Sequence, residues 1–326
     1  MEKITIPLFI INFNRLKLLK KQLNFFKTIK DVDLKIIIVD NNSSYPKLLK
    51  FYEQKFNMKN KLPIHNGYGN YYESKDGVIL FKSNHNKVQC GPWNMGVIPS
   101  FIYDGWVDTY QKNFDAGVQC CGIPSCGIEL LSSDNKTCKV CVDIWEAMKI
   151  KHPYYIVTDV DLTFNGIPTD FISKYITILE EHPSLNKVGT GFPSDDIPEW
   201  NPLKDIIKRQ EGMQYGNPIE NSVGMELYNA GIDTTFALYR SDDINRINDK
   251  RCTFPVTSHM TGVMLHNSAR SLGKYSAKHT PWYINPIEDE EENYYLRHAA
   301  GGWTSSHLHQ IKEFFDKVKK KEKDNG

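Results

Sequence analysis

The sequence lacks an excess of either charge and a long hydrophobic run. Its 326 residues contain 40 Lys and Arg against 39 Asp and Glu, a net charge of +1. Such a chain has no overall electrostatic attraction to nucleic acid or acidic lipid. The N-terminal apolar run, residues 6–11, is too short for a membrane span or a secretory signal. We therefore expect no nucleic-acid partner, no transmembrane segment and a cytoplasmic location, where thiols stay reduced.

Internal repeats of fixed period and long linkers are absent as well. With 40% hydrophobic and 24% charged residues, the chain can bury a large core without disulfide or metal support. We expect a single domain over residues 1–326, with a first part at 1–164 and a second at 165–316. The charged residues 317–326 are predicted to form a flexible tail at a fraying helix end.

Apolar runs alternate with segments of helical spacing. The runs predict buried strands at residues 4–13, 34–40, 77–84, 154–159, 187–192 and 232–240, and the spacing predicts helices at 15–29, 45–56 and 170–181. A strand that is apolar on both faces is typical of a parallel sheet covered by helices on both sides. The pattern predicts an α/β fold, a three-layer sandwich with a mostly parallel central sheet.

A cysteine-rich segment, at about residues 100–151, departs from this pattern, and we interpret it as an insertion. Its cysteines are Cys120, Cys121, Cys126, Cys138 and Cys141. One C-x₂-C and one C-x₄-C spacing would allow four thiolates to hold a structural Zn²⁺. Disulfides, should the chain meet an oxidising compartment, and ordinary thiols are the alternatives.

Two acids, Asp159 and Asp161, end the most apolar strand of the sequence, YYIVTDVD. In open α/β sheets, this end of a strand faces the crevice where ligands bind. Two carboxylates one residue apart repel each other unless a divalent cation or a proton lies between them. The pair predicts a metal site, with a turn or helix-capping role as the alternative. Ion pairs of both acids with protein cations would speak against a metal.

The order of several motifs resembles that of GT-A fold glycosyltransferases, particularly the family 2-like group. The motifs are PLFIINFNRLKLL, IIIVDNNSS, NHNKVQCGPWNMG and YYIVTDVDL; the later PSDDIPEW, AGIDTTFALYR and YSAKHTPWY are similar to a bacterial and viral subgroup. The resemblance covers most of the chain, with the cysteine-rich insertion as the main departure. It implies a Rossmann-like GT-A domain whose first part binds a nucleotide-sugar and whose second part binds the acceptor.

The resemblance also implies roles for individual residues. Asp159 and Asp161 would hold Mn²⁺ or Mg²⁺ against the diphosphate of a UDP- or GDP-sugar, with His279 as a candidate third ligand. Further donor contacts would come from Asn12, Asp40, Asn84, Gly91, Trp93 and Asn94. The structural alternatives are an Asx-type turn at Asp40, a core position for Trp93 and a packed surface position for His279.

An inverting transfer needs a base that removes the proton of the acceptor hydroxyl. Asp195 and Asp196 follow the strand at 187–192, and Asp233 begins the TTFALYR strand, so all three are candidates, with Asp196 and Asp195 ranked first. The acidic pair that such enzymes carry after this strand comes too early here, at Asp242 and Asp243, and is expected to cap a helix.

The acceptor would be a glycan, a glycoprotein or a small hydroxyl compound. Late aromatic residues could stack on acceptor sugar rings or form part of the core: Trp200, Trp282, Tyr283 and Trp303.

Other functions share parts of this pattern. DVDLT also matches the D-x-D-x-T motif of haloacid-dehalogenase-type phosphatases, in which Asp159 would be the nucleophile, but the match is local. A nucleotidyltransferase is disfavoured because NFNR, and no Gly-rich turn, follows the first strand. A non-catalytic protein that binds glycan or protein through the insertion is a third alternative.

Overall fold

The computed structural model describes residues 3–62, 68–84, 86, 97–105, 149–232, 235–242, 267–286, 288–299 and 303–324. Within these residues one sheet contains ten strands, in the spatial order β10-β11-β13-β9-β12-β7-β1-β2-β4-β3. Their bounds are β1 Thr5–Asn12, β2 Asp33–Asp40, β3 Gly69–Glu73, β4 Ile79–Ser83, β7 Tyr154–Asp159, β9 Lys187–Thr190, β10 Tyr215–Pro218, β11 Leu227–Ala230, β12 Ala237–Arg240 and β13 Ser268–Ser271.

Two small ladders stand beside the main sheet. Strand β8 (Leu162–Thr163) pairs with β14 (Lys278–His279), and β5 (Tyr103–Asp104) pairs with β6 (Lys149–Ile150). The helices are α1 Lys17–Phe26, α2 Pro46–Lys55, α4 Val97–Ile102, α7 Phe171–Glu181, α8 Lys204–Gly212, α10 Glu290–His298 and α11 Trp303–Asp324, with 3₁₀ turns η5 Gly273–Tyr275 and η6 Thr280–Tyr283.

The predicted α/β fold with a mostly parallel sheet is confirmed. The pairings orient seven of the ten described strands in one direction, and only β3, β12 and β11 run the opposite way. Strands β4, β2, β1 and β7 form the continuous parallel centre. The predicted strands and helices of this half correspond to β1, α1, β2, α2, β4 and β7.

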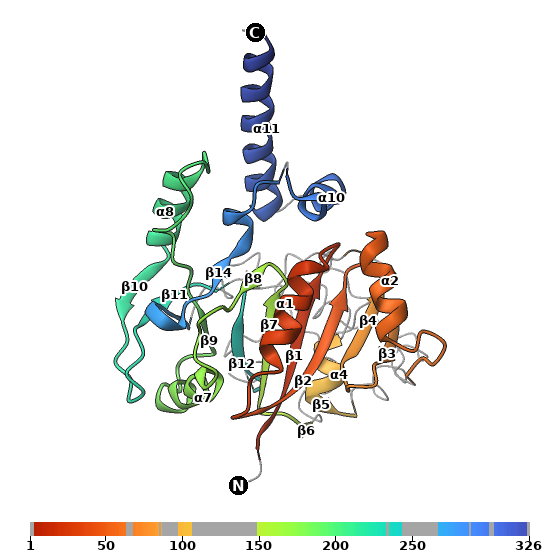
Figure 1. Cartoon of the computed structure of the whole chain (residues 1–326). Coiled ribbons are helices and arrows are strands. Elements are labelled where there is room, and N and C mark those ends of the chain that lie inside the picture. Colours follow the sequence, from red (N-terminus) through yellow and green to blue (C-terminus); the bar gives the residue numbers. More distant parts are fainter. Residues whose placement is uncertain are drawn as a thin grey trace, which may run out of the picture.

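Alternate side chains of the central strands enter two separate cores. In β1, Leu8 and Ile10 pack with residues of α1, α2 and α7, whereas Phe9 and Ile11 pack with residues of α4. This alternation follows from the period of two in a strand. Helices thus cover both faces of the sheet, and the three-layer arrangement is confirmed (Figure 1).

Helices α10 and α11 lie beyond the carboxyl ends of the central strands, and α11 extends away from the sheet (Figure 1). The charged C-terminal residues belong to α11, which continues to Asp324. The cysteine-rich insertion leaves the described chain at residue 105 and returns at 149, where β5 and β6 pair. Its five cysteines and the zinc prediction lie outside the described residues.

A buried glutamine of α1 fixes the turn after β7. Gln22 Nε2 donates to the main-chain oxygens of Asp159 (2.8 Å) and Leu162 (3.1 Å). Because buried carbonyl groups need partners, the Gln22 side chain holds the turn from Asp159 to Leu162, which contains both acids of the DVD motif.

Replacing Gln22 with Ala should lower the free energy of unfolding by about 1–3 kcal/mol, because the buried Leu162 carbonyl loses the Gln22 donor and the Asp159 carbonyl keeps only its bond from the Thr158 hydroxyl among the side-chain bonds described. Urea denaturation measures the loss. The matched control is Lys21→Ala, an exposed neighbour on the same helix, which should change stability by about 0.5 kcal/mol or less. Equal stabilities of the two variants would contradict the anchoring role.

Candidate functional site

The strand order reverses beside β1. Strands β2 and β4 lie on one side of β1, and β7 lies on the other. The register pairs Asn12 with Asp40 and Ile11 with Asp159, so these residues meet at the carboxyl edge of the sheet. A crevice at such a reversal point is where open α/β sheets bind ligands. The fold therefore places Asn12, Asp40 and Asp159 at the edge where the sequence predicts a donor site.

Asp161 is joined to a buried arginine. Arg15 Nη1 donates to Asp161 Oδ2 at 2.8 Å, and Arg15 Nη2 donates to Glu292 Oε2 at 2.8 Å. Exposed fractions of these side chains are 3% for Arg15, 8% for Asp161 and 2% for Glu292. The guanidinium also lies over the ring of Tyr295, 3.8 Å from its centroid. Thus one of the two acids of the predicted metal site is already paired with a protein cation.

Burial controls the electrostatics of this cluster. Burial lowers the pKa of Arg15, but Glu292, Tyr295 and Asp161 raise it by more, so the net shift is upward. Burial raises the pKa of Glu292, and Arg15 works against that shift. Charges removed from water are stable only when they are paired and hydrogen-bonded. Arg15 and Glu292 therefore depend on each other for their charged states.

A two-stranded ladder brings His279 to Asp161. His279 in β14 pairs with Leu162 in β8, and the Thr280 amide donates to the Asp161 carbonyl oxygen at 2.9 Å. As a result, His279 Nε2 lies 3.7 Å from Asp161 Oδ2. The imidazole also packs on Trp282, with ring centroids 4.7 Å apart. This placement fits both predictions for His279, that of a metal ligand and that of a packed side chain.

We tested whether this cluster suits a divalent ion. Asp161 Oδ1 is buried and has no hydrogen-bond partner among the described residues. Carboxylate oxygen and imidazole nitrogen suit Mn²⁺. No group of three or more His, Cys, Asp or Glu side chains in the described ranges is placed to hold a metal ion. That outcome is compatible with ions bound by one or two carboxylates and completed by substrate phosphates. The donor set thus fits an ion shared with a ligand.

Asn12 and Asp40 belong to a buried hydrogen-bond network. Tyr52 donates its hydroxyl to Asp40 Oδ2 (3.0 Å), and Asn12 Nδ2 donates to the same hydroxyl oxygen (2.9 Å). Asp40 Oδ1 accepts from the Ser43 amide at 3.0 Å, which is the turn considered as the alternative. Burial raises the pKa of Asp40. Contact of either residue with a nucleoside stays a prediction; the network shows their structural role.

The other predicted donor contacts fall largely outside the described residues. Gly91, Trp93 and Asn94 lie there, as does the loop that would carry them. Asn84 is described and exposed after β4, and its amide donates to the Tyr68 carbonyl oxygen at 2.7 Å.

Of the two candidate bases that the structure describes, Asp196 makes more contacts than Asp195. It accepts from the Tyr283 hydroxyl at 2.6 Å and from Lys278, and these two bonds lower its pKa. Asp195 is 99% exposed and lies 3.3 Å from Lys208 Nζ. Asp233 is outside the described residues, as is Asp243, and the structure therefore bears only on the first two.

The late aromatic residues divide between core and surface. Trp282 is 5% exposed and packs on His279 and Phe192, whereas Trp200 is 37% exposed. Tyr283 packs partly against the core. The side chain of Trp303 is outside the described part of the chain.

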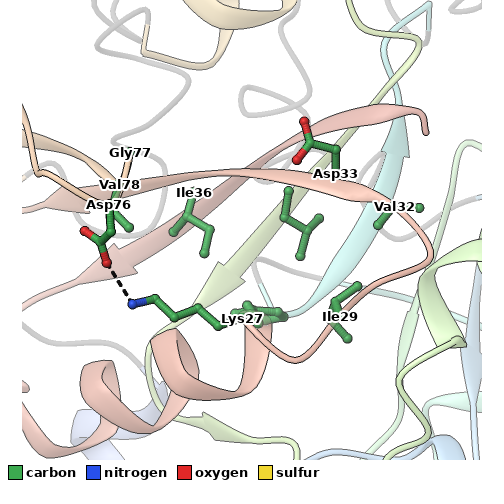
Figure 2. Close-up of a pocket in the computed structure, with 10 residues that line it drawn as sticks. Lys27, Ile29, Val32, Asp33, Ile36, Asp76, Gly77 and Val78 are labelled. Carbon is green, nitrogen blue, oxygen red and sulfur yellow. Dashed lines mark hydrogen bonds and ion pairs between the residues drawn. The ribbon is translucent and has the colours of Figure 1, made fainter. Parts of the chain in front are cut away.

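A separate pocket of about 200 Å³ lies near the amino end of β2 (Figure 2). Ile29, Val32 and Ile36 line it, and Lys27 pairs with Asp76 at its rim at 2.7 Å. Hydrogen bonds from Lys27, Lys55 and Ser74 hold the pKa of Asp76 well below its usual range. Because this pocket is at the opposite end of β2 from Asp40, it is not part of the candidate site.

Sequence reasoning missed Arg15 and Glu292. Arg15 directly follows the NFN segment after the first strand, and Glu292 lies in the acidic run EDEEEN. The two are 277 positions apart, so no local spacing connects them. The signal available in the sequence was an arginine directly after the first predicted strand, at the edge where a ligand is expected.

Comparisons with known proteins found no matching family model and no significant match among curated proteins. Among solved structures, the chain is similar to a mannosyltransferase of Pyrobaculum calidifontis in complex with GDP-Man and Mn²⁺. That likeness has 10% identity, covers 95% of this chain and 74% of the other, and has a TM-score of 0.40. It is also similar to residues 1–349 of TarS of S. aureus, with 10% identity, coverage of 94% and 69%, and a TM-score of 0.37. Likenesses of this size do not assign a role to any residue here.

No helix in the described residues has the length and apolar character needed to cross a membrane.

Replacing Arg15 with Met should destabilise the protein by about 3–5 kcal/mol, because it leaves two buried carboxylates unpaired. Lys17→Met is the matched control: Lys17 pairs with Asp289 at 2.8 Å but is 59% exposed, so its loss should cost about 1 kcal/mol or less. Urea denaturation at neutral pH compares the two. A loss for Arg15→Met no larger than that of the control would show that the buried cluster does not depend on this cation.

Proposed function

We propose that the protein is a metal-dependent glycosyltransferase of GT-A type that transfers a sugar from a UDP- or GDP-sugar to an acceptor hydroxyl with inversion. The observation that carries the proposal is the surroundings of Asp161, which follows β7 at the reversal point of the sheet. Its buried Oδ1 atom has no hydrogen-bond partner among the described residues. His279 Nε2 lies 3.7 Å from the other oxygen, Oδ2. The resemblance of the sequence motifs to that class supplies the chemistry.

Asp161 would hold Mn²⁺ or Mg²⁺, with Asp159 and His279 as the further predicted ligands. Because no three such side chains of the described residues are placed together for an ion, phosphates of the donor would complete its coordination. When bound, the ion would neutralise charge on the departing nucleoside diphosphate. Gln22 fixes the turn that presents the two acids, and the β8–β14 ladder fixes the distance of His279 from Asp161. These contacts come from three separate elements, α1, β8 and β14, and they constrain the backbone that carries Asp161 and His279.

The charge of the cluster favours a cation. Asp159, Asp161 and Glu292 all act on Tyr295, as does Arg15. Asp161 and Glu292 bring two carboxylates to the one guanidinium of Arg15, which leaves one negative charge in excess among these three buried side chains. Since uncompensated buried charge is costly, an added cation would be stabilised there. This excess is a physical reason to expect a divalent ion even though Arg15 is present.

Asp196 is the base that we favour. Asp196 accepts a hydrogen bond from Lys278, which precedes His279 in strand β14. The same short strand thus contacts Asp196 and carries the proposed metal ligand His279. Hydrogen bonds from Lys278 and Tyr283 lower the pKa of Asp196, so its carboxylate is charged at neutral pH, and the same bonds reduce its strength as a base until an acceptor hydroxyl replaces one of them. Asp195 and Asp233 stay as alternatives. Acceptor sugars would contact exposed aromatic surface such as Trp200.

A UDP- or GDP-sugar should raise the melting temperature only when Mn²⁺ or Mg²⁺ is present. Asp161→Asn and Asp159→Asn should each abolish that shift, because each removes a charged ligand from the ion. Thermal melting with a panel of nucleotide-sugars, with and without manganese, measures it. Glu290→Gln is the control, since Glu290 is an exposed acid that pairs with Lys47.

An unaltered shift in both aspartate variants would remove the metal assignment. Release of inorganic phosphate from phosphate esters, lost in Asp159→Asn while metal binding persists, would instead favour the phosphatase alternative.

Replacing Asp196 with Asn should lower turnover by about 10²–10⁴-fold and leave the donor-induced melting shift intact, because the base acts on the acceptor alone. Asp195→Asn, which alters an outward-facing neighbour, should stay within about threefold of the unmodified protein if Asp196 is the base. Sugar transfer to acceptor and donor binding are measured on the same preparations. Full activity of Asp196→Asn would transfer the role to Asp195 or Asp233.

A further inference from the structure

Helix α10 is fixed to the carboxyl edge of the sheet through its acidic face. Asp289 caps its first turn, accepting from the amides of Glu291 and Glu292, and also pairs with Lys17. Glu291 accepts from the Lys17 amide at 2.9 and 3.1 Å. Tyr294 donates to the Ser44 carbonyl oxygen at 3.0 Å. The helix is therefore held by the first residue of α1 and by the loop between β2 and α2, beside the candidate site.

Glu292 has a contact that its neighbours lack. It is buried and binds Arg15 through a single charged hydrogen bond, while Arg15 binds Asp161 through another. An arginine has parallel N–H donors that often bind both oxygens of one carboxylate. Here the two terminal nitrogens are divided between two carboxylates, so only Oδ2 of Asp161 is occupied by Arg15 and Oδ1 keeps no partner in the described chain.

We propose that Glu292 is a positioning residue for the metal site, which it serves by drawing one arm of Arg15 away from Asp161. The inference rests on the proposed function and adds to it a residue of the C-terminal part of the chain. Without the Glu292 charge, Arg15 can turn both donors to Asp161 and cover the oxygen intended for the ion.

The change in charge and the change in geometry are both expected to weaken the binding of a divalent ion. Loss of the Glu292 charge makes the cluster more positive by one unit, which repels a divalent ion. Coverage of Asp161 Oδ1 removes a ligand. Both effects weaken metal binding, and outer partners of metal ligands typically change affinity by about 10–100-fold.

The test is the affinity of the full chain for Mn²⁺ alone, measured from the electron paramagnetic resonance signal of the free ion. Glu292→Gln should weaken binding by about 10–100-fold. Glu291→Gln is the matched control, because Glu291 is equally buried on the same helix and its hydrogen bonds within the described residues are with the Lys17 amide. It should bind Mn²⁺ within about threefold of the unmodified protein. Melting temperatures without metal show how far each change loosens α10.

Several outcomes would overturn the inference. Unchanged Mn²⁺ affinity in Glu292→Gln, with the unmodified protein binding well, overturns it and leaves the proposed function standing. An equal loss in both variants shows that α10 has a general structural role. Absence of Mn²⁺ binding in the unmodified protein overturns the proposed metal site and this inference together.

A second variant covers the case in which Glu292→Gln does not fold. Arg15→Lys keeps the positive charge, but a lysine ammonium lacks the fork that holds two carboxylates apart. It should also weaken Mn²⁺ binding about tenfold or more. Affinity equal to that of the unmodified protein would contradict the positioning role.

Discussion

The guanidinium of Arg15 joins three distant parts of the chain. Arg15 follows β1, Asp161 follows β7, and Glu292 lies on α10, so one cation connects the ends of two neighbouring central strands to helix α10. Each charge is buried, and none would be stable alone. The orientation of Asp161, and with it the Oδ1 atom that has no hydrogen-bond partner among the described residues, depends on this cluster, as does part of the attachment of α10.

A buried ion pair of this kind contributes little net stability compared with a well-packed apolar group of the same volume. Its effect here is on orientation: it fixes which oxygen of Asp161 is occupied. The Gln22 hydrogen bonds and the β8–β14 ladder constrain the same turn from other sides. Independent elements thus converge on one carboxylate, as expected where a side chain must be held in a defined geometry.

The central strands were predictable because burial on both faces produces a continuous apolar run, as in β1, β2 and β7. The outer strands carry no such signal. Strand β10, YGNP, is largely exposed, and β13, SARS, is buried but polar. In β13, Ser271 meets the Tyr175 hydroxyl at 2.6 Å, and Arg270 donates to the Gly231 carbonyl oxygen at 2.7 Å. Such partners become visible only once the chain is folded.

The same limit applies to the site. The resemblance of the motifs predicted that His279 and the Asp159–Asp161 pair bind one ion. The structure places His279 beside Asp161. Local spacing could not show that Arg15 would occupy one oxygen of Asp161, since 146 positions separate them. Nor could it show that Asp40 would be enclosed with Tyr52.

The most direct measurement is anomalous X-ray scattering from crystals grown with Mn²⁺ and a nucleoside diphosphate. We expect a manganese peak at bonding distance from Asp161 Oδ1, with Arg15 still on Oδ2 and His279 or Asp159 completing the protein ligands. A contradictory result would be both oxygens of Asp161 bound to Arg15 and a nucleotide present without manganese at this carboxylate.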